Sequence, residues 1–348
     1  MKMLNQDVLI IGGGIAGMQA ALDIAASGRS VVLADKDEIL GGHVKDYTCL
    51  FPDLSDGRAL AAQKIARIEA SSNITVKLLT EVSDLERCEG GFKASFTKNS
   101  VLESQNFGAV VIAAGYGNFD GTKYGEYGYG RYPGVITGIE FEQNMAEILR
   151  KPVKTALFIK CVGARDRSKG MPYCSKICCM YTAKQAKELK NAHPAANVYV
   201  TYMDIRANFK NGEEFVRSVM EEERVRYIRG RVGKVFPVND RLIVRMEDTL
   251  KGVPQEIEAD LVVLATAMVP INSTNNVVKK VGGRVDGNGF IASLPLAESL
   301  NPMEVAKGVY YAGACGFPCD VREALNQGSA AAAGVLSYFS KQREAVNE

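Results

Sequence analysis

A glycine-rich turn between two apolar segments near the N-terminus constrains the fold of this chain more than any other feature. Residues 7–11 read Asp-Val-Leu-Ile-Ile and residues 30–35 read Ser-Val-Val-Leu-Ala-Asp, and both patterns predict buried β-strands. A helix pattern covers residues 17–26 between them. A strand, a helix and a second strand form a βαβ unit, which requires a parallel sheet with a right-handed crossover. The sequence therefore predicts an α/β fold.

The turn itself, Gly-Gly-Gly-Ile-Ala-Gly at residues 12–17, predicts a dinucleotide site. Gly12, Gly14 and Gly17 fit the pattern G-x-G-x-x-G. In this pattern the first glycine permits a tight turn, the second lets the backbone approach a pyrophosphate, and the third lets the helix pack on the strand. The helix N-terminus offers unpaired N–H groups to the phosphates, and Asp35 stands where an acid binds ribose hydroxyls. The alternative is a glycine turn without a ligand, which the surrounding strand, helix and acid disfavour.

Composition excludes several other functions. The formal net charge is +2, whereas nucleic-acid binding needs clustered Lys and Arg, so we expect no nucleic-acid partner. No apolar run reaches the roughly 18 residues that span a bilayer, so we expect no transmembrane segment. The chain has 2 histidines, which excludes a multi-histidine metal site. The N-terminal segment lacks a small-residue cleavage site, so we expect a cytoplasmic protein whose thiols stay reduced unless they bind metal or are redox-active.

A second strand–helix–strand pattern occurs about 140 residues after the first. It comprises predicted strands at residues 155–160 and 197–203 and a predicted helix at residues 175–191. Further buried strands are predicted at residues 109–113, 260–265 and 308–312, and a Gly- and Tyr-rich loop or linker at 115–138. The strand at residues 155–160 is followed by Cys-Val-Gly-Ala-Arg and not by a second G-x-G-x-x-G, which disfavours nicotinamide binding at this unit.

Four of the 8 cysteines fall at the start of this second unit, at Cys161, Cys174, Cys178 and Cys179. Their spacing, C-x12-C-x3-C-C, matches zinc sites poorly, and a reducing compartment disfavours structural disulfides. Four thiolates suit a [4Fe–4S] cluster. Cys174 and Cys178 would share one helix face, but Cys179 would be rotated by about 100°, so the helix must start irregularly if both ligate. Buried free cysteines are the alternative.

Several segments resemble flavoproteins of the thioredoxin-reductase type, which carry two dinucleotide folds. Residues 308–314, Gly-Val-Tyr-Tyr-Ala-Gly-Ala, are similar to their closing motif G-V-x-x-A-G-D, with Ala314 in place of the acid. Residues 110–116 resemble their A-T-G strand, and residues 80–82 resemble the segment whose backbone, here at Val82, meets the adenine. The resemblance implies FAD as the nucleotide. It further implies an FAD domain of residues 1–150 and 255–348, with residues 151–254 inserted as a Rossmann-like domain that carries the iron–sulfur cysteines.

The resemblance also implies which residues contact FAD. They are Gly12, Gly14, Ile15, Ala16, Gly17, Asp35, Lys36, Gly41, Gly42, His43, Phe51, Val82, Ala113, Ala114, Gly115, Gly313 and Ala314. For His43, an ordinary polar loop residue is an equal alternative. Cys49 lies in the same loop as Phe51 and is expected near the flavin, whereas Cys88 is expected to have no role and His193 to cap a helix.

The cysteine segment resembles the A subunits of the heterodisulfide reductase family. Their motif C-V-G-[SA]-R-D, then Y-C-S-x-x-C-C, then K-Q-A, is matched at residues 161–166, 173–179 and 184–186. The resemblance implies that Cys161, Cys174, Cys178 and Cys179 hold a [4Fe–4S] cluster near the FAD. Larger family members add C-x2-C-x2-C segments, which this sequence lacks, so it resembles the short A subunits.

The family resemblance implies an electron-transfer subunit that binds FAD and [4Fe–4S]. Its expected partners are iron–sulfur B and C subunits and a second copy of the chain in a homodimer. The short length favours the sulfur-oxidising heterodisulfide-reductase-like complex, which implies a lipoate-binding protein as a further partner. The alternatives are the A subunit of a quinone-interacting membrane-bound oxidoreductase, an NAD(P)H-dependent disulfide reductase and a non-enzymatic scaffold that keeps flavin for stability. The disulfide reductase would use Cys315 and Cys319 as its catalytic thiols. Two small buried residues in a tight loop are the alternative for that pair.

Overall fold

The predicted βαβ unit lies at the centre of a six-stranded sheet. The computed structural model describes residues 5–169 and 171–347. In it, the first two strands run parallel with Val8 opposite Val31, and the predicted helix connects them. The strand order is β20-β21-β7-β1-β2-β3. The elements are β1 (Val8–Ile11), α1 (Ile15–Ala25), β2 (Val31–Ala34), β3 (Ile74–Lys77), β7 (Ala109–Ile112), β20 (Glu304–Ala306) and β21 (Val309–Tyr311). The predicted α/β fold is confirmed.

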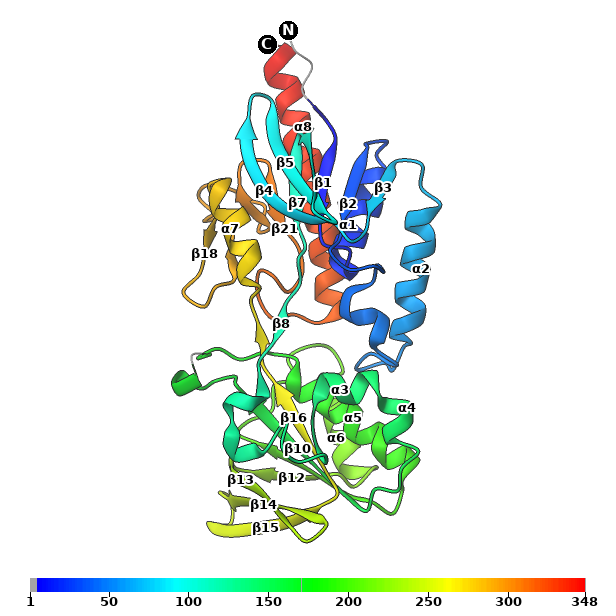
Figure 1. The fold of residues 1–348 in the computed structure, drawn as a ribbon, viewed down its shortest axis with the longest axis vertical. Helices are drawn as coiled ribbons and strands as arrows, with labels where there is room; N and C mark the ends of the chain where they lie inside the picture. Colours follow the sequence, from blue (N-terminus) through cyan, green and yellow to red (C-terminus); the bar gives the residue numbers. More distant parts are fainter. Residues whose placement is uncertain (1–4, 170, 348) are drawn as a thin grey trace. The chain divides into compact units, whose positions relative to one another are not determined.

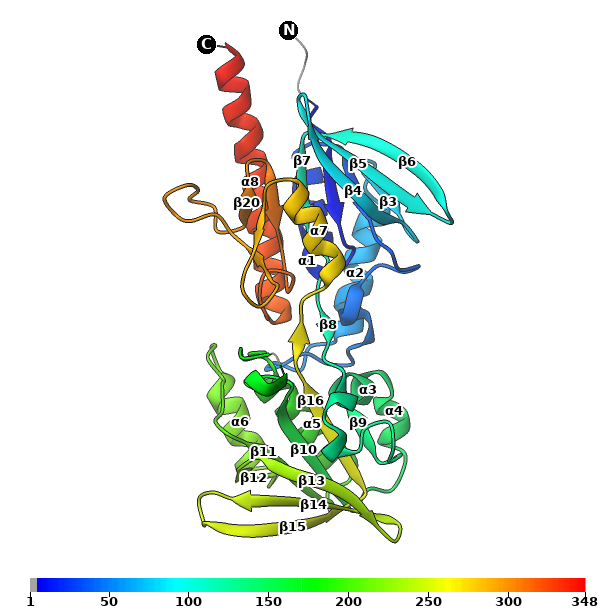
Figure 2. The same cartoon turned by 60° about the vertical axis from the view of Figure 1, so that its left-hand side comes forward.

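Helices and a small antiparallel sheet surround these strands (Figures 1 and 2). Helix α1 packs against α2 and α8, and β5 contacts β7. The close approach of α1 and α8 depends on Gly328, where a Cβ atom would lie 2.5 Å from the carbonyl oxygen of Ala16. The surrounding elements are η1 (Gly42–Asp46), α2 (Gly57–Glu69), β4 (Glu81–Cys88), β5 (Gly91–Lys98), β6 (Val101–Phe107), α7 (Asn272–Lys280), β18 (Arg284–Val285), β19 (Ile291–Ala292) and α8 (Val321–Asn347).

The second predicted strand–helix–strand pattern forms the centre of a separate five-stranded parallel sheet. Its order is β12-β11-β10-β16-β9, and α5 connects β10 to β11. A three-stranded antiparallel sheet, β13-β14-β15, lies between β12 and β16 in the chain. The strands are β9 (Val135–Thr137), β10 (Thr155–Val162), β11 (Asn197–Tyr202), β12 (Arg226–Arg229), β13 (Val232–Val238), β14 (Arg241–Asp248), β15 (Val253–Ala259) and β16 (Leu261–Thr266). The helices are η2 (Gly121–Lys123), η3 (Gly125–Tyr127), α3 (Gly138–Gln143), α4 (Met145–Ile148), η4 (Arg167–Lys169), α5 (Cys178–Ala192) and α6 (Gly212–Glu221).

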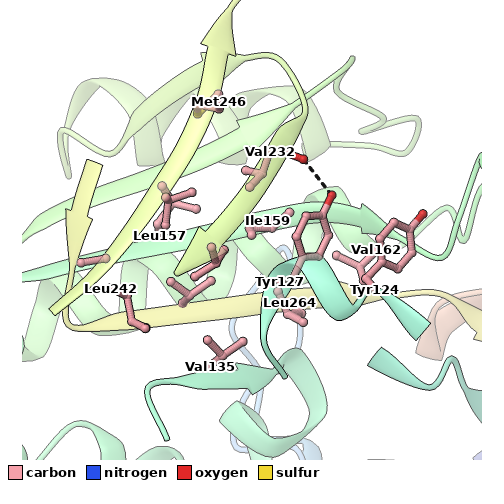
Figure 3. Packing of buried hydrophobic residues seen from close by; sticks show 14 of the residues in the cluster. Tyr124, Tyr127, Val135, Leu157, Ile159, Val162, Val232, Leu242, Met246 and Leu264 are labelled. Carbon is pink, nitrogen blue, oxygen red and sulfur yellow. Dashed lines mark hydrogen bonds between the residues drawn. The ribbon is translucent and has the colours of Figure 1, made fainter. Parts of the chain in front are cut away.

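Strand β10 separates two apolar cores. All of its residues are buried, as expected for a parallel strand with both faces covered. Because successive side chains of a strand point to opposite faces, Ala156 and Phe158 pack with α5, whereas Leu157 and Ile159 pack with β13, β14 and Tyr127 (Figure 3). The segment at 115–138, predicted as a loop or linker, therefore contributes buried aromatic rings to the second of these cores.

The structure divides the chain at other positions than the sequence pattern suggested. Unit 1 contains the described residues of Met1–Lys45, Gly57–Gly117 and Pro270–Glu348, and unit 2 contains those of Asp46–Asp56 and Asn118–Val269. We expected boundaries at 150/151 and 254/255, but these positions lie inside unit 2. The reason is that β9 pairs with β16 and β16 with β10, so both flanking segments complete one sheet. Two short strands, β8 (Gly117–Asn118) and β17 (Met268–Val269), pair where the chain passes between the units.

One buried hydrogen bond in unit 2 offers a test of this packing. The Tyr127 hydroxyl donates to the carbonyl oxygen of Val232 at 3.0 Å (Figure 3). In Tyr127→Phe that carbonyl loses its partner, and we expect unit 2 to lose about 1 kcal/mol of unfolding free energy, measured by urea denaturation followed by circular dichroism. Tyr132→Phe is the control, because Tyr132 packs on the same cluster and its hydroxyl makes no hydrogen bond within the described residues. An equal loss of unfolding free energy in both variants would contradict a stabilising role for the Tyr127–Val232 hydrogen bond.

Candidate functional site

The glycine turn after β1 is packed so closely that two of its positions exclude any side chain. Gly12 has φ +109°, and a Cβ atom there would lie 2.3 Å from the carbonyl oxygen of Ala113 on the neighbouring strand end. A Cβ atom at Gly17 would lie 1.9 Å from the carbonyl oxygen of Gly12. These contacts bring the start of α1 against β1 and β7, as the first and third glycines of the motif require.

Gly14 is different, because its surroundings are open. It is the N-cap of α1, and a Cβ atom at this position would have no atom within 4 Å among the described residues. No side chain caps the helix, and its first turn carries no acidic residue. The first N–H groups of α1 are therefore available beside an open space, which is the arrangement that binds a phosphate at a helix N-terminus.

The carboxylate of Asp35 holds this turn in place. It accepts hydrogen bonds from the backbone N–H of Gly13 and, at 2.8 Å, from that of Asp37. Gly41 donates its N–H to the carbonyl oxygen of Gly13 at 2.9 Å, and Gly42, with φ +52°, lies against Gly14. The acid at the end of β2 thus shapes the phosphate turn, and its ribose contact stays a prediction.

Other predicted FAD residues gather around the same turn in unit 1. Gly313, with φ +79°, lies beside Ala16 and donates its N–H to Oε1 of Gln327 at 2.9 Å. The His43 ring lies against the Tyr116 ring, with centroids 4.4 Å apart. The structure brings the following predicted positions into this region of unit 1: Gly12, Gly14, Ile15, Ala16, Gly17, Asp35, Lys36, Gly41, Gly42, His43, Ala113, Ala114, Gly115, Gly313 and Ala314.

Two predicted FAD residues have different surroundings. Val82 lines a pocket of about 550 Å³ between β4 and α7. Two residues before it, the N–H of Thr80 donates to the carbonyl oxygen of Asp35 at 2.8 Å. Phe51 belongs to unit 2, where its ring lies 5.9 Å from that of Phe209. Its loop is held there by Lys184, which donates to the carbonyl oxygen of Cys49 at 2.8 Å. The FAD contacts of Val82 and Phe51 stay predictions.

The four predicted cluster cysteines converge at the end of β10 and the start of α5. Cys178 hydrogen-bonds to both Cys161 and Cys179, and the charges of these two neighbours act on Cys174. Cys161, Cys178 and Cys179 are buried, and Cys174 is half-buried. The segment between Cys161 and Cys174 is anchored by Asp166, which accepts from the Tyr124 hydroxyl and from Arg231. Tertiary contacts therefore bring together thiols that lie up to eighteen positions apart in the sequence.

The helix starts irregularly, as the two adjacent cysteines require. Helix α5 begins at Cys178 and not at the predicted residue 175, and Lys176 before it has φ +61°. In the first turn of α5, Cys178 faces Cys161, whereas the Sγ atom of Cys179 lies 3.4 Å from Nζ of Lys160 and 3.8 Å from the carbonyl oxygen of Asp204. Both cysteines thus reach the same buried region from neighbouring positions.

The electrostatics of this region favour thiolate. The hydrogen bond from Cys178, followed by the charge of Lys160, lowers the pKa of Cys179 to about 5, although burial opposes the shift. A hydrogen bond from Cys178 likewise lowers the pKa of Cys161. As the donor in both contacts, Cys178 has a raised pKa. Thiolate is the form of cysteine that ligates metal, so the donor set has the chemistry of a metal site.

The four thiols are the kind of donor set that an iron–sulfur cluster takes. A [4Fe–4S] cluster takes four Cys thiolates, one for each iron, so its ligands surround an extended body. Four converging thiols with Lys160 and Arg165 as neighbouring cations match that requirement.

An aromatic ring packs on the turn that follows β10. Gly163 has φ +84°, and a Cβ atom there would lie 2.4 Å from the Phe119 ring. The Phe119 ring therefore packs directly against the backbone of this turn. A dinucleotide would need its pyrophosphate against the backbone of this turn, and the absence of nicotinamide binding here stays a prediction.

Cys315 and Cys319 are both buried in unit 1. The Cys315 thiol lies 3.3 Å from the carbonyl oxygens of Ile112 and Ala312, to which it donates. Burial raises the pKa of Cys315 to about 11. Since the thiolate is the nucleophile, this geometry favours a packing role for Cys315, and the catalytic role of the pair stays a prediction.

Sequence reasoning missed several polar residues around the cysteines. Lys160 is buried on β10 and donates to Cys179, and Lys184 and Glu142 form a buried ion pair at 2.7 Å on α5 and α3. One signal was present for Lys160, a lysine that ends the otherwise apolar run Thr-Ala-Leu-Phe-Ile-Lys directly before Cys161. Glu142 had no such signal, because its partner lies 42 positions away in the chain.

Comparison with known proteins connects this geometry to one group of relatives. Residues 7–110 match the family model described as FAD dependent oxidoreductase, which supports FAD as the nucleotide of unit 1. An iron-sulfur A subunit of the CoB--CoM heterodisulfide reductase of Methanopyrus kandleri is 29% identical over 97% of this chain and 65% of its own length. The A subunit of the H(2):CoB-CoM heterodisulfide,ferredoxin reductase of Methanothermobacter marburgensis is 30% identical over 95% of this chain and 63% of its own length.

The chain is a relative of the heterodisulfide reductase A subunits. The predicted resemblance is thereby confirmed at the level of these subunits. The chain spans somewhat less than two thirds of the curated relatives that it matches, with 65% and 63% of the two described above.

Solved structures confirm the predicted fold class. Thioredoxin reductase of T. acidophilum matches with a TM-score of 0.68 and 20% identity over 97% of this chain and 99% of its own. A NAD-dependent persulfide reductase of A. fulgidus matches with a TM-score of 0.62 and 20% identity over 94% of this chain and 58% of its own. The chain therefore has the thioredoxin-reductase-like fold. Within the described residues, no helix combines the length and apolar character needed to cross a membrane.

The open space at Gly14 leads to the first test of the nucleotide site. In Gly14→Val the Cβ atom meets no described atom within 4 Å, and the side chain fills the space that a pyrophosphate would approach, so we expect at least about a tenfold loss of FAD affinity in a folded protein. Flavin absorbance after reconstitution and dialysis measures the loss. Gly287→Val is the matched control, because a Cβ atom at Gly287 also has no neighbour within 4 Å. Full FAD retention by Gly14→Val would contradict the site.

The two kinds of cysteine in unit 1 should differ in reactivity. Cys315 is buried with a raised pKa of about 11, whereas Cys88 is exposed. At neutral pH, and without denaturant, we expect iodoacetamide to alkylate Cys315 at least about a hundredfold more slowly than Cys88, because burial both shields Cys315 and lowers its thiolate fraction. Peptide mass spectrometry over time gives both rates. Comparable rates would show that Cys315 is a reactive thiol.

Proposed function

We propose that this chain is an FAD- and [4Fe–4S]-containing electron-transfer subunit of a heterodisulfide-reductase-like complex. The observation that carries the proposal is the convergence of Cys161, Cys174, Cys178 and Cys179 at the start of α5, in a relative of heterodisulfide reductase iron-sulfur subunits. In a nucleotide-binding unit of this fold, the phosphates bind at that helix end. Here thiols are buried at the same place, which supports a cluster as the group that replaces the nucleotide.

The residues that would hold each group are on separate units. In unit 1, Gly12, Gly14 and Gly17 would receive the FAD pyrophosphate at the N-terminus of α1, with Asp35 fixing the turn. In unit 2, the four cysteines would hold the cluster. When bound, a flavin supplies two-electron chemistry and an iron–sulfur cluster supplies one-electron transfer.

The chain's own residues prepare the sites for these groups. The Phe119 ring packs on the turn at Gly163, which supports a unit 2 that binds a cluster in place of a second dinucleotide. The salt bridge between Arg165 and Asp204, 2.7 Å long, holds the backbone beside Cys179. Burial of three of the four cysteines keeps water and oxidants away from the ligands.

The finer assignment concerns the partners. We propose iron–sulfur B and C subunits, a homodimeric arrangement and cytoplasmic sulfur oxidation with lipoate-bound sulfur, in line with the short A subunits that the sequence resembles. The A subunit of a quinone-interacting oxidoreductase is the second candidate within the same family resemblance. Co-purification of this chain with its neighbours from its own host, followed by mass spectrometry, distinguishes a lipoate-binding protein from membrane quinone-reactive subunits.

The cluster assignment has a direct chemical test. Anaerobically purified wild-type protein should contain iron and acid-labile sulfide together with FAD, and its visible absorption should bleach with dithionite. In Cys179→Ser we expect most of the iron to be lost while FAD is retained, because the two groups would bind different units. Cys88→Ser is the matched control, since Cys88 is exposed on β4 and should leave both contents unchanged.

Three outcomes would overturn the proposal. Intact wild-type protein without iron would refute the cluster. Steady NADH oxidation by the isolated chain would instead favour an NAD(P)H-dependent disulfide reductase. Flavin and cluster absorptions that dithionite leaves unchanged would favour a scaffold that keeps its flavin for stability alone.

A further inference from the structure

A lysine and a tyrosine lie near Cys179 but are not among the four predicted cluster ligands. Lys160 is buried on β10, and its Nζ atom donates to Sγ of Cys179 at 3.4 Å. Tyr227, on β12, has a hydroxyl that is buried and has no hydrogen-bond partner within the described residues. A buried hydroxyl without a partner is costly, so its position here points to a group that it serves.

Three neighbouring strands build this environment. Lys160 comes from β10, Tyr202 from β11 and Tyr227 from β12, which are adjacent in the sheet. The Lys160 ammonium lies 5.2 Å from the centroid of the Tyr202 ring and 5.6 Å from that of the Tyr227 ring. Both rings therefore contact the ammonium through cation–π interactions. Tyr227 thus lies against the ammonium that contacts Cys179. Burial, followed by the charge of Cys179, raises the pKa of Tyr227.

We propose that Lys160 and Tyr227 set the reduction potential of the iron–sulfur cluster by placing a positive charge and a hydroxyl donor beside its ligand Cys179. This inference rests on the proposed function, because it requires a cluster on the four cysteines. Lys160 and Tyr227 act through Cys179 and are positioning residues. Protein charges and hydrogen bonds near the cluster sulfurs are among the factors that set such potentials.

The direction of the effect follows from charge. Reduction of the cluster adds one electron, supplied in the experiment by dithionite, and it makes or breaks no covalent bond in the protein. The added negative charge is stabilised by a nearby ammonium in a region of low dielectric, so Lys160 raises the potential. A hydrogen bond from the Tyr227 hydroxyl, which has no partner among the described residues, would act in the same direction.

The test compares midpoint potentials of three variants with wild type by anaerobic dithionite titration followed by electron paramagnetic resonance. Lys160→Met removes the charge at similar length, and we expect the ratio of reduced to oxidised cluster at a fixed potential to fall at least tenfold, a shift of about 59 mV to lower potential. Lys160→Arg keeps the positive charge, so its midpoint potential should shift clearly less than that of Lys160→Met. Tyr227→Phe removes only the hydroxyl and should shift it in the same direction as Lys160→Met, by a smaller amount.

Iron and sulfide content of each variant separates this inference from the proposed function. Wild-type protein without iron would refute both. Full iron content with the wild-type midpoint in Lys160→Met would overturn the inference and leave the proposed function standing. Loss of iron in Lys160→Met but not in Lys160→Arg would show that the charge is needed to assemble the cluster, which overturns a tuning role for Lys160. An unchanged midpoint in Tyr227→Phe would remove Tyr227 from the proposal.

Discussion

The junction between β10 and α5 determines what unit 2 can bind. Strand β10 is buried on both faces, and its register with β16 shifts between Ile159 and Val162. At this shift, Cys161 adopts φ +61°, a conformation that costs energy for a residue other than glycine and persists only when its surroundings enforce it. The irregular strand end places Cys161 opposite the first turn of α5, where Cys178 and Cys179 begin the helix. The thiol cluster depends on this local geometry.

The two units show how one topology serves different ligands. Both contain a strand, a turn, a helix and a second parallel strand. In unit 1, glycines bring backbone against backbone and leave open space at Gly14. In unit 2, an aromatic ring covers Gly163, and thiols take the helix start. Since the fold itself is shared with many proteins, the chemistry of each turn is the evidence for function.

Unit 2 also buries several charged side chains. The ion pair between Lys184 and Glu142 is almost completely buried, and Lys184 also donates to the backbone of Cys49. This contact ties the segment Asp46–Asp56 to α5, although its neighbours in the chain belong to unit 1. Lys160 is buried as well, and its ammonium donates to Sγ of Cys179. Such groups are costly to bury unless they are paired, so each of them points to a partner whose charge it offsets.

The sequence by itself determined the βαβ units, the G-x-G-x-x-G turn and the identity of the four clustered cysteines. These features are local, because strand and helix periodicity, the glycine pattern and the cysteine spacing all lie within short segments. The tertiary structure alone decided that Asp35 hydrogen-bonds to the turn, that residues 118–150 and 255–269 complete the sheet of unit 2, and that Lys160 and Tyr227 lie near Cys179. Each of these depends on pairing between strands or side chains that are distant in the chain, and no local pattern encodes which distant partner a residue will meet.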